Sequence, residues 1–188
     1  MSRWQPDARG RLEQAAMELY AAQGFDATTV AEIADRAGLT ERTFFRHFTD
    51  KREVLFSGQA TLTASMVAAV AEAAPEVSSI DAVAAAVRAA GAIIGPRRDN
   101  ARRRQAVIDA NPGLQERELI KLATLATALT DALHERGLDY RAARLAAEVG
   151  IAMFKVTFER WIRAEDDPEF DEVLAEALAD LKVVTAGG

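Results

Sequence analysis

One stretch near the start of the chain limits the possible folds more than any other. Thr29 and Glu32 form the pattern of a helical capping box, which predicts a short helix that begins there and ends at Gly38. Thr40 caps a second short helix, which reaches about Phe48. Two short helices joined by a tight turn that contains glycine are typical of a helix-turn-helix.

The same outline fits an ordinary helical hairpin, so the side chains of the second helix have to decide between the two. At about 100° per residue, Phe44 and Phe48 fall on one face and are expected in the core. The opposite and flanking positions, called the reading face below, carry Arg42, Thr43, Phe45 and Arg46. Arginine pairs with guanine O6 and N7, and threonine or phenylalanine can contact a thymine methyl group. The reading face therefore predicts contact with the major groove of DNA, although Phe45 taken alone could also be a core residue.

Four further residues are candidates for contacts with the DNA backbone. Thr29 and Thr40 begin helices, where free N–H groups and the helix dipole favour an anion. His47 and Lys51 follow the reading face and can bind phosphate oxygens. The alternatives are simple helix caps for the two threonines and a surface or core-edge position for His47.

The net charge of −6 at first argues against DNA binding, but its distribution removes the objection. Residues 1–52 hold eight basic and eight acidic side chains, so the remaining residues carry the whole negative charge. Between residues 36 and 52 there are five bases and two acids. An acidic body with a locally basic tip suits a protein that grips DNA at one end.

Helical periodicity runs through the whole chain and strand signals are nearly absent, which predicts an all-α fold. We expect about nine helices, over residues 7–23, 29–37, 40–48, 50–74, 80–94, 100–110, 112–136, 139–164 and from 167 onward. The fourth is expected to be one long helix that starts with a second capping box at Asp50. Asp167 and Pro168 are expected to open the ninth. We place a three-helix DNA-binding domain at residues 1–55 and a larger effector-binding and dimerisation domain at 56–188.

The last two predicted helices offer a surface for a second copy of the chain. A single helix-turn-helix contacts too few base pairs for useful specificity, so a homodimer on a double-stranded, palindromic operator is expected. The eighth helix is apolar on more than one side, and the ninth carries a continuous apolar stripe. The candidate interface residues are Phe158, Trp161, Phe170, Leu174, Leu178 and Leu181. The alternative is a monomeric helical core.

Five arginines between residues 97 and 104 predict a second kind of site. They can hold the anionic end of a small-molecule effector whose apolar tail lies between the helices, or they can form a solvated basic face. The candidate ligand residues are Met66, Arg102, Arg103, Ile108, Leu122 and Phe154.

Several classes of protein are disfavoured by what the sequence lacks. It has no cysteine and two histidines, and it contains none of the common zinc, phosphate-loop or serine-hydrolase motifs. We therefore expect no enzyme and assign no cofactor or metal. The N-terminus lacks a secretory apolar region and no apolar run is long enough for a membrane span, so a cytoplasmic protein without a membrane partner is expected. An all-helical scaffold protein with a vestigial helix-turn-helix stays open as an alternative.

Residues 28–55 resemble the N-terminal domain of TetR-type repressors. The resemblance is carried by the T-x-x-x-I-A-x-x-A-G-[VL]-[ST] run from Thr29, the aromatic-x-[HY]-F step that ends at Phe48, and the D-K-x-x-[VL]-[LF] run from Asp50. It implies phosphate contacts for Thr29, Thr40, His47 and Lys51, and base contacts for Arg42, Thr43 and Arg46. The chain departs from the family at Arg42, where Gly or Pro is common, and at Phe45, where Tyr is common.

A weaker resemblance concerns the effector. Residues 102–114 look like the corresponding region of acyl-CoA-responsive TetR-type regulators, which suggests an acyl-CoA or a fatty-acid-like molecule. The expected function is a ligand-responsive regulator, in the first place a repressor that its effector releases from the operator. We expect the fourth helix to transmit the effector's signal to the DNA-binding helices. The sequence leaves open whether the protein is an activator instead.

Overall fold

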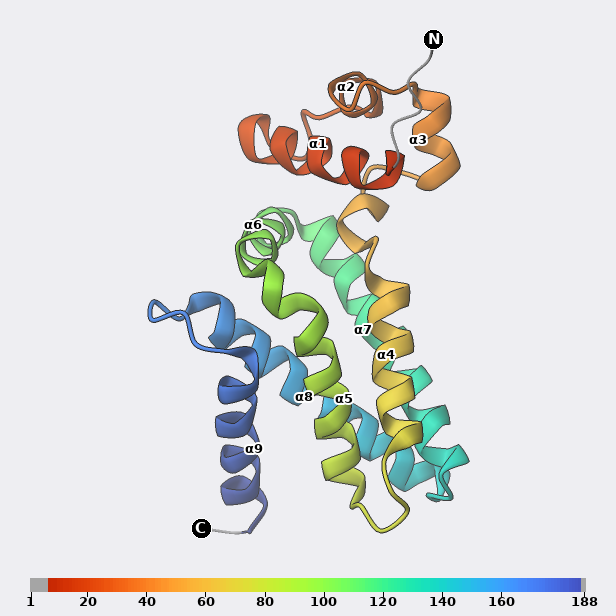
Figure 1. Ribbon diagram of the computed structural model, residues 1–188, viewed down its shortest axis with the longest axis vertical. Helices are drawn as coiled ribbons and strands as arrows, with labels where there is room; N and C mark the ends of the chain where they lie inside the picture. The colour runs from red at the N-terminus through yellow and green to blue at the C-terminus, as the bar shows by residue number, and fades with distance from the viewer. Residues whose placement is uncertain (1–6, 187–188) are drawn as a thin grey trace. The chain divides into compact units, whose positions relative to one another are not determined.

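A computed structural model describes residues 7–186 of the chain, and within them it consists of α-helices and short 3-10 helices (Figure 1). The elements are α1 Ala8–Gln23, α2 Val30–Arg36, α3 Glu41–His47, η1 Glu53–Phe56, α4 Gln59–Glu72, α5 Ser79–Ile94, η2 Gly95–Arg97, α6 Arg98–Asp109, α7 Pro112–Glu135, α8 Tyr140–Arg163 and α9 Phe170–Ala186. The predicted all-α fold with about nine helices is confirmed.

The described chain forms two compact units. The head unit comprises residues up to 58 together with residues 102–117, and the body unit comprises residues 59–101 and 118 onward. The first segment of the head ends three residues beyond the predicted domain boundary at residue 55. Its second segment, the α6–α7 turn, comes from a part of the chain that the sequence assigned to the body.

Helix α1 is amphipathic as its sequence predicts. Its buried side chains are Leu12, Ala15, Ala16, Leu19 and Tyr20, which recur every three to four residues along one face. The helix ends at Gly24, whose φ of 86° lies in the left-handed region where glycine is favoured. The predicted extent of this first helix and the position of its stop are confirmed.

The predicted single fourth helix is wrong. The Oδ1 of Asp50 accepts the N–H groups of Arg52 and Glu53 at 2.8 and 3.0 Å, but the residue that precedes the next helical turn is Arg52, which makes no side-chain cap. The turn that follows is the 3-10 helix η1, and α4 begins only after Gly58. A glycine costs a helix interior about 1 kcal/mol relative to alanine, which favours a break at this position. Asp50 therefore bonds to the backbone in the predicted place, but it does not cap a continuous helix.

The α6–α7 turn completes the core of the head unit. Ile108 and Leu114, which are 0% and 1% exposed, belong to the same apolar cluster as Leu12 and Phe44. Two arginines add polar contacts with η1. Arg104 Nε donates to the Leu55 carbonyl at 2.6 Å, and its guanidinium lies 5.1 Å from the centre of the Phe56 ring. Arg117 Nε donates to Glu53 at 2.7 Å.

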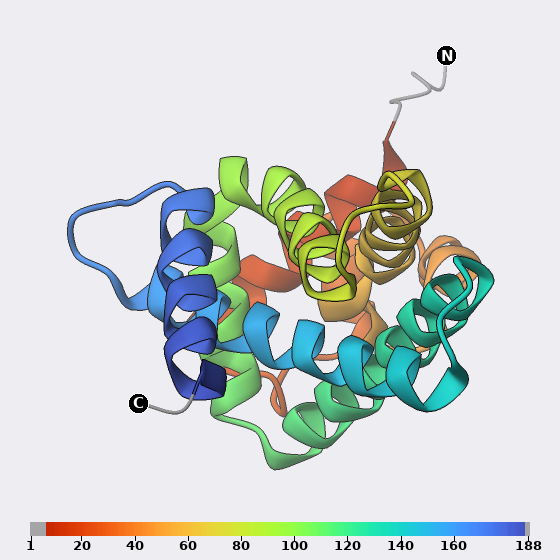
Figure 2. The same ribbon diagram turned by 90° about the horizontal axis from the view of Figure 1, so that it is seen from below.

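The body unit is built around α5, which packs against α4, α8 and α9 (Figure 2). Two glycines let helices approach one another closely in this unit. A Cβ atom at Gly91 of α5 would lie 2.2 Å from the ring of Phe170, and one at Gly150 of α8 would lie 3.1 Å from Val83. The face of α5 toward these partners is accordingly rich in alanine and valine.

Two arginines close helix ends within the body unit. Arg98, which is 9% exposed, donates to the carbonyls of Trp161 and Ala164 at the end of α8 and pairs with Asp167. Arg136 donates to three carbonyls around the end of α4, those of Val70, Ala73 and Ala74. The last carbonyls of a helix have no partner within it, so a cation that donates to them stabilises the end of the helix.

The predicted start of the ninth helix is also wrong. Asp167 has a φ of 52° and pairs with Arg98 instead of capping a helix. Helix α9 begins at Phe170, and the side chain of Glu172 accepts the N–H of Glu169 at 3.2 Å. The partner of Asp167 lies 69 positions away in the sequence, so local cap signals could not reveal this arrangement.

The residues predicted for the dimer interface lie in or against the core of the body unit. Trp161, Phe170 and Leu174 are at most 4% exposed within a single chain. Phe158, Leu178 and Leu181 are half-buried against the same cluster. The apolar side chains of α8 and α9 that do reach the surface are Leu145, Val156, Val183 and Val184.

The residues predicted to bind an effector divide between the two units. Met66 is fully buried in the core of the body unit, and Leu122 and Phe154 are half-buried against that core. Arg102, Arg103 and Ile108 belong to the head unit, where Ile108 is a core residue.

Within residues 7–186, two stretches pass a test of length and composition for a membrane span, contrary to the expectation that no apolar run was long enough. They are residues Glu53–Glu72 and Ser79–Asp109. In the most apolar window of each stretch, 28% and 39% of the residues, respectively, are buried. The test uses length and composition alone, and core helices of water-soluble proteins also pass it. Ser57 and Gly58 interrupt the first stretch, and Gly95 and Pro96 fall inside the second.

The contact at Gly91 leads to a prediction for stability. In G91A the new methyl group would overlap the Phe170 ring, and relieving such overpacking costs about 1–3 kcal/mol of unfolding free energy. In the control G95A the new methyl group points into open space, so we expect a change within about 0.5 kcal/mol. Denaturant unfolding of both variants measures the difference. Equal stability of the two variants would contradict this packing.

Candidate nucleic-acid interface

Helices α2 and α3 are joined by a turn that requires glycine. Gly38 has a φ of 67°, its N–H donates to the Asp35 carbonyl at 2.9 Å, and the next N–H, of Leu39, donates to the Ala34 carbonyl at 2.8 Å. This pair of bonds is the Schellman motif that closes a helix at a left-handed residue. Arg11 from α1 donates to the Ala37 carbonyl at 3.1 Å and holds the turn against the first helix. The predicted turn geometry is confirmed.

The orientation of α3 is set by two phenylalanines, as predicted. Phe44 and Phe48 are 0% and 4% exposed in the core of the head unit, with ring centres 5.5 Å apart. Thr40 caps the helix by accepting the N–H of Thr43 at 3.2 Å. A helix anchored on one face in this way presents its opposite face to solvent.

The reading face is exposed and its charges are uncompensated. Arg42 and Arg46 are exposed, and neither forms an ion pair or a hydrogen bond with any side chain in residues 7–186. Phe45 is 55% exposed and makes an edge-on contact with the core residue Phe44. Thr43 is half-buried, and its hydroxyl lies 3.1 Å from that of Thr40. Exposed guanidinium groups beside an exposed aromatic ring can serve the base contacts for which they were predicted.

The N-terminus of α2 carries its own carboxylate. The predicted capping box is confirmed, since Glu32 accepts both the backbone N–H and the hydroxyl of Thr29 at 2.8 Å while donating its own N–H to the Thr29 hydroxyl. Hydrogen bonds from the Thr29 backbone, and then from its hydroxyl, lower the pKa of Glu32 below its ordinary value of 4.5. Glu32 is therefore ionised at neutral pH. Its carboxylate accepts from both the N–H and the hydroxyl of Thr29, the groups that were expected to bind a phosphate.

His47 and Lys51 follow the reading face, but they are placed very differently. His47 is half-buried, and its Nε2 is buried without a hydrogen-bond partner among the described residues. Lys51 turns its ammonium group inward, where it donates to the carbonyls of Phe25, Asp26 and Thr28 at 2.8, 3.2 and 2.7 Å. The phosphate contact expected for Lys51 would have to compete with these three bonds.

The basic residues between positions 36 and 52 are thus not equivalent. Arg36 pairs with Glu18 at 3.1 Å, and Lys51 faces the carbonyls of the α1–α2 turn. Arg42, Arg46 and Arg52 remain exposed without an ion pair among the described residues. Arg52 was not a predicted site residue, because its sequence position suggested only the first turn of a helix.

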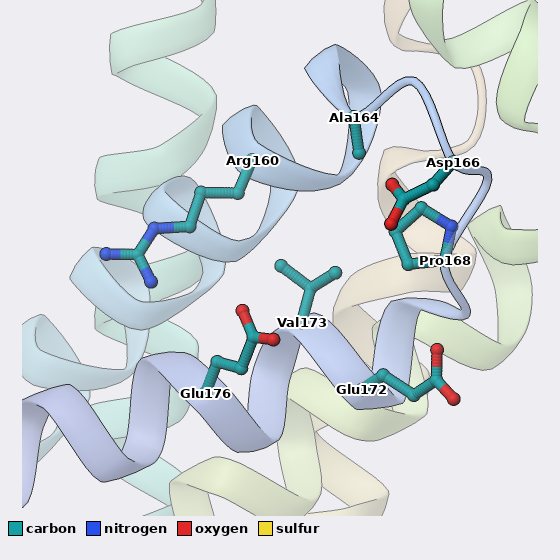
Figure 3. A pocket seen from close by; sticks show the side chains of 7 residues that line it. All are labelled: Arg160, Ala164, Asp166, Pro168, Glu172, Val173 and Glu176. Atoms are coloured by element: carbon teal, nitrogen blue, oxygen red, sulfur yellow. The ribbon is translucent and has the colours of Figure 1, made fainter.

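A surface depression between α8 and α9 is the other candidate site. It has a volume of about 470 Å³, and Arg160, Ala164, Asp166, Pro168, Glu172, Val173 and Glu176 line it (Figure 3). None of these residues was predicted to bind a ligand. The guanidinium of Arg160 pairs with Asp180 at 2.7 Å, which leaves three carboxylates to dominate the lining. Such a surface repels an anionic ligand. Within residues 7–186 no cluster of His, Asp or Glu side chains is arranged to hold a metal ion.

Comparison with known families agrees with the geometry of the head. Residues 13–57 match the model of bacterial regulatory proteins of the TetR family, and residues 77–186, more than half of the chain, match that of the MftR C-terminal domain. The chain belongs to the TetR family. This TetR-family protein is a transcription regulator, not an enzyme, and its helix-turn-helix is the DNA-binding element.

A curated relative supports the N-terminal match. The chain is 41% identical over 61 residues to the HTH-type transcriptional regulator TcmR of Streptomyces glaucescens. The match covers 32% of this chain and 27% of that relative, so the two proteins share about a quarter of the relative's length.

Solved structures of low sequence identity share the fold over nearly the whole chain. The fatty acid degradation regulator FadR from Bacillus halodurans is 17% identical with a TM-score of 0.65, covering 95% of this chain and 96% of that one. FadR from Bacillus subtilis, solved in complex with stearoyl-CoA, is 20% identical with a TM-score of 0.64, covering 92% and 96%. Thermus thermophilus FadR, solved in complex with lauroyl-CoA, is 22% identical with a TM-score of 0.51, covering 92% of each chain.

Proposed function

We propose that this TetR-family regulator is a repressor that binds a palindromic operator as a homodimer and is released by a small-molecule effector. The observation that supports it most strongly is the reading face of α3, where two unpaired arginines flank an exposed Phe45. Exposed arginines without ion-pair partners can pair with guanine edges in a major groove, and the aromatic ring beside them can contact a thymine methyl group. Because such a regulator acts on DNA, we propose that the protein is located in the cytoplasm.

We assign the contacts with DNA as follows. Arg42 and Arg46 bind guanine edges, and Thr43 and Phe45 contact thymine methyl groups. Thr40 and His47 contact the DNA backbone, which fixes the register of the helix without reading sequence. Thr29 can join them only where a phosphate displaces the Glu32 carboxylate from its hydroxyl.

The assignment of Arg42 is tested by selecting bound sequences from a random DNA pool. We expect a palindromic motif that contains guanines, and R42A should relax the preference at one base pair per half-site by about 1–3 kcal/mol. The control R52A removes an exposed cation outside the reading face, so it should leave the motif unchanged. A motif for R42A identical to that of the wild type would contradict the assignment.

For the dimer we propose an interface on the exposed face of α8. Leu145, Val149, Ala152 and Val156 recur at intervals of four, three and four residues, which is the spacing of a coiled-coil seam. Leu145 and Val156 are 68% and 42% exposed in the single chain. Val183 and Val184 of α9 are 67% and 79% exposed. Phe158, Leu178 and Leu181 are half-buried and Trp161, Phe170 and Leu174 are buried, so we propose that these six side chains support the interface from within the body unit.

A charge in this seam should separate the two copies. V156E would place a carboxylate in an apolar interface, so we expect a monomer in sedimentation equilibrium at concentrations where the wild type is a dimer. The control T127E adds the same charge to an exposed position of α7, and it should remain a dimer. A dimeric V156E would rule out this seam as the interface.

The effector that we propose is an acyl-CoA or a fatty-acid-like molecule. Support comes from structural relatives solved with stearoyl-CoA and lauroyl-CoA, although at such low identity the likeness itself establishes only the fold. We propose that Met66, Leu122 and Phe154 of the body unit contact the acyl chain, since α4 carries no charged residue between Gln59 and Ala71. Arg102 and Arg103 belong to the head unit, and their predicted role in binding an anionic group is a separate proposal.

The signal to the head then has a route through α6 and α7 as well as α4. The α6–α7 turn is packed into the head core by Ile108 and Leu114 and is held to η1 by Arg104 and Arg117. We propose that an effector bound in the body acts on the head through this turn, in addition to α4.

A series of acyl-CoAs of increasing chain length, with free coenzyme A as the control, tests the effector. A ligand at 100 times its Kd stabilises the folded protein by about 2.7 kcal/mol, which raises the melting temperature. We expect this rise to grow with chain length and to accompany release from the operator. If no member of the series changes either quantity, the effector class is wrong and the DNA-binding function is unaffected.

A further inference from the structure

The ammonium group of Lys51 has no free donor left for DNA. A lysine ammonium offers three N–H bonds. In the head unit three carbonyl oxygens accept from it, those of Phe25, Asp26 and Thr28, and the nitrogen also lies 4.4 Å from the centre of the Phe25 ring. Lys51 is half-buried by these contacts. Binding to a phosphate would require these bonds to be broken.

The three carbonyls belong to the turn that connects α1 to α2. The turn is tight, since the Thr28 N–H donates to the Phe25 carbonyl at 3.2 Å and the Thr28 hydroxyl donates to the Gly24 carbonyl at 2.7 Å. Carbonyl dipoles that converge on one point repel one another, and a cation between them removes the repulsion. The Thr28 carbonyl directly precedes Thr29, the residue that caps α2. The ammonium therefore fixes the chain at the point where it enters α2.

Lys51 itself is held from the other side. The hydroxyl of Tyr20 donates to the Lys51 carbonyl at 2.6 Å. Burial, and then the charge of Asp50, raise the pKa of Tyr20 above its ordinary value, so the phenol remains a donor throughout the physiological range. The main chain at Lys51 is thus fixed to α1 while its side chain is fixed to the α1–α2 turn.

We propose that Lys51 is a positioning residue for DNA binding and not a phosphate contact. It locks the α1–α2 turn, which sets the start of α2 and, through the Gly38 turn, the orientation of the reading face on α3. The inference rests on DNA binding by the helix-turn-helix. It departs from the role that the resemblance to TetR-type repressors implied for this lysine. Its positive charge binds carbonyl oxygens inside the head. It therefore does not neutralise a phosphate and releases no counterion from DNA.

The salt dependence of operator binding distinguishes the two roles. A lysine that neutralises one phosphate contributes about 0.9 to the slope of log K against log salt. K51M retains the length of the side chain but cannot donate. We expect K51M to bind the operator at least about tenfold more weakly at each salt concentration, a free-energy difference of about 1.4 kcal/mol. The slope of log K against log salt should equal that of the wild type. The control R52M removes the same charge one residue away and leaves the turn intact.

Three results of this experiment would overturn the proposal. They are a slope smaller in magnitude by about 0.9 in K51M than in the wild type, an unchanged operator affinity and melting temperature, and a reduced melting temperature without a loss of affinity at temperatures where K51M is fully folded. The last result would show a structural role alone. If the wild-type chain itself failed to bind any selected DNA, the proposed function would fail instead, so the two failures are distinguishable.

A measurement on the unmodified chain covers the case in which K51M does not fold. In ¹⁵N-labelled protein, an ammonium group held by three carbonyls exchanges its protons slowly enough to give an N–H correlation for Lys51 without DNA. We expect that signal to persist unshifted when operator DNA is added. A signal absent from the free protein, or one that shows coupling to ³¹P in the complex, would contradict the positioning role.

Discussion

Cationic side chains that donate to main-chain carbonyls hold the ends of the helices in this protein. Arg11 donates to a carbonyl at the end of α2, and Lys51 donates to carbonyls of the turn after α1. Arg136 and Arg98 donate to carbonyls at the ends of α4 and α8, respectively. Each comes from a different element and lies 23 to 66 positions from its partner carbonyl. Because buried carbonyls without partners are costly, these contacts decide where the helices end and how the turns between them run.

This use of positive charge changes how the basic residues of the head are understood. Counting charges along the sequence treats every lysine and arginine near the helix-turn-helix as available to DNA. The structure divides them into cations that hold the head together and cations that face outward without partners. The second group is small and centres on Arg42 and Arg46, which makes the electrostatic surface of the head more local than its composition suggests.

Local signals in the sequence predicted local structure well. The capping box at Thr29, the left-handed Gly38 and the phase of Phe44 and Phe48 all depend on residues within one or two turns, and all are confirmed. The start of α9 could not be predicted, because Asp167 is drawn to an arginine far away in the sequence. For the same reason, the sequence could not show that Lys51 faces inward. Apolar stripes also fail to distinguish a chain's own core from a partner's surface, as Trp161 illustrates.

The head unit is discontinuous in sequence, and this has a consequence for its synthesis. Its apolar core includes Ile108 and Leu114, which are separated from the helix-turn-helix by the body segment of residues 59–101. A ribosome releases the chain from its N-terminus, so α1 to α3 emerge long before the side chains that complete their core. The head can close only after most of α4 to α6 has been made. Competence to bind DNA should therefore appear only after the first segment of the body, residues 59–101, has been synthesised.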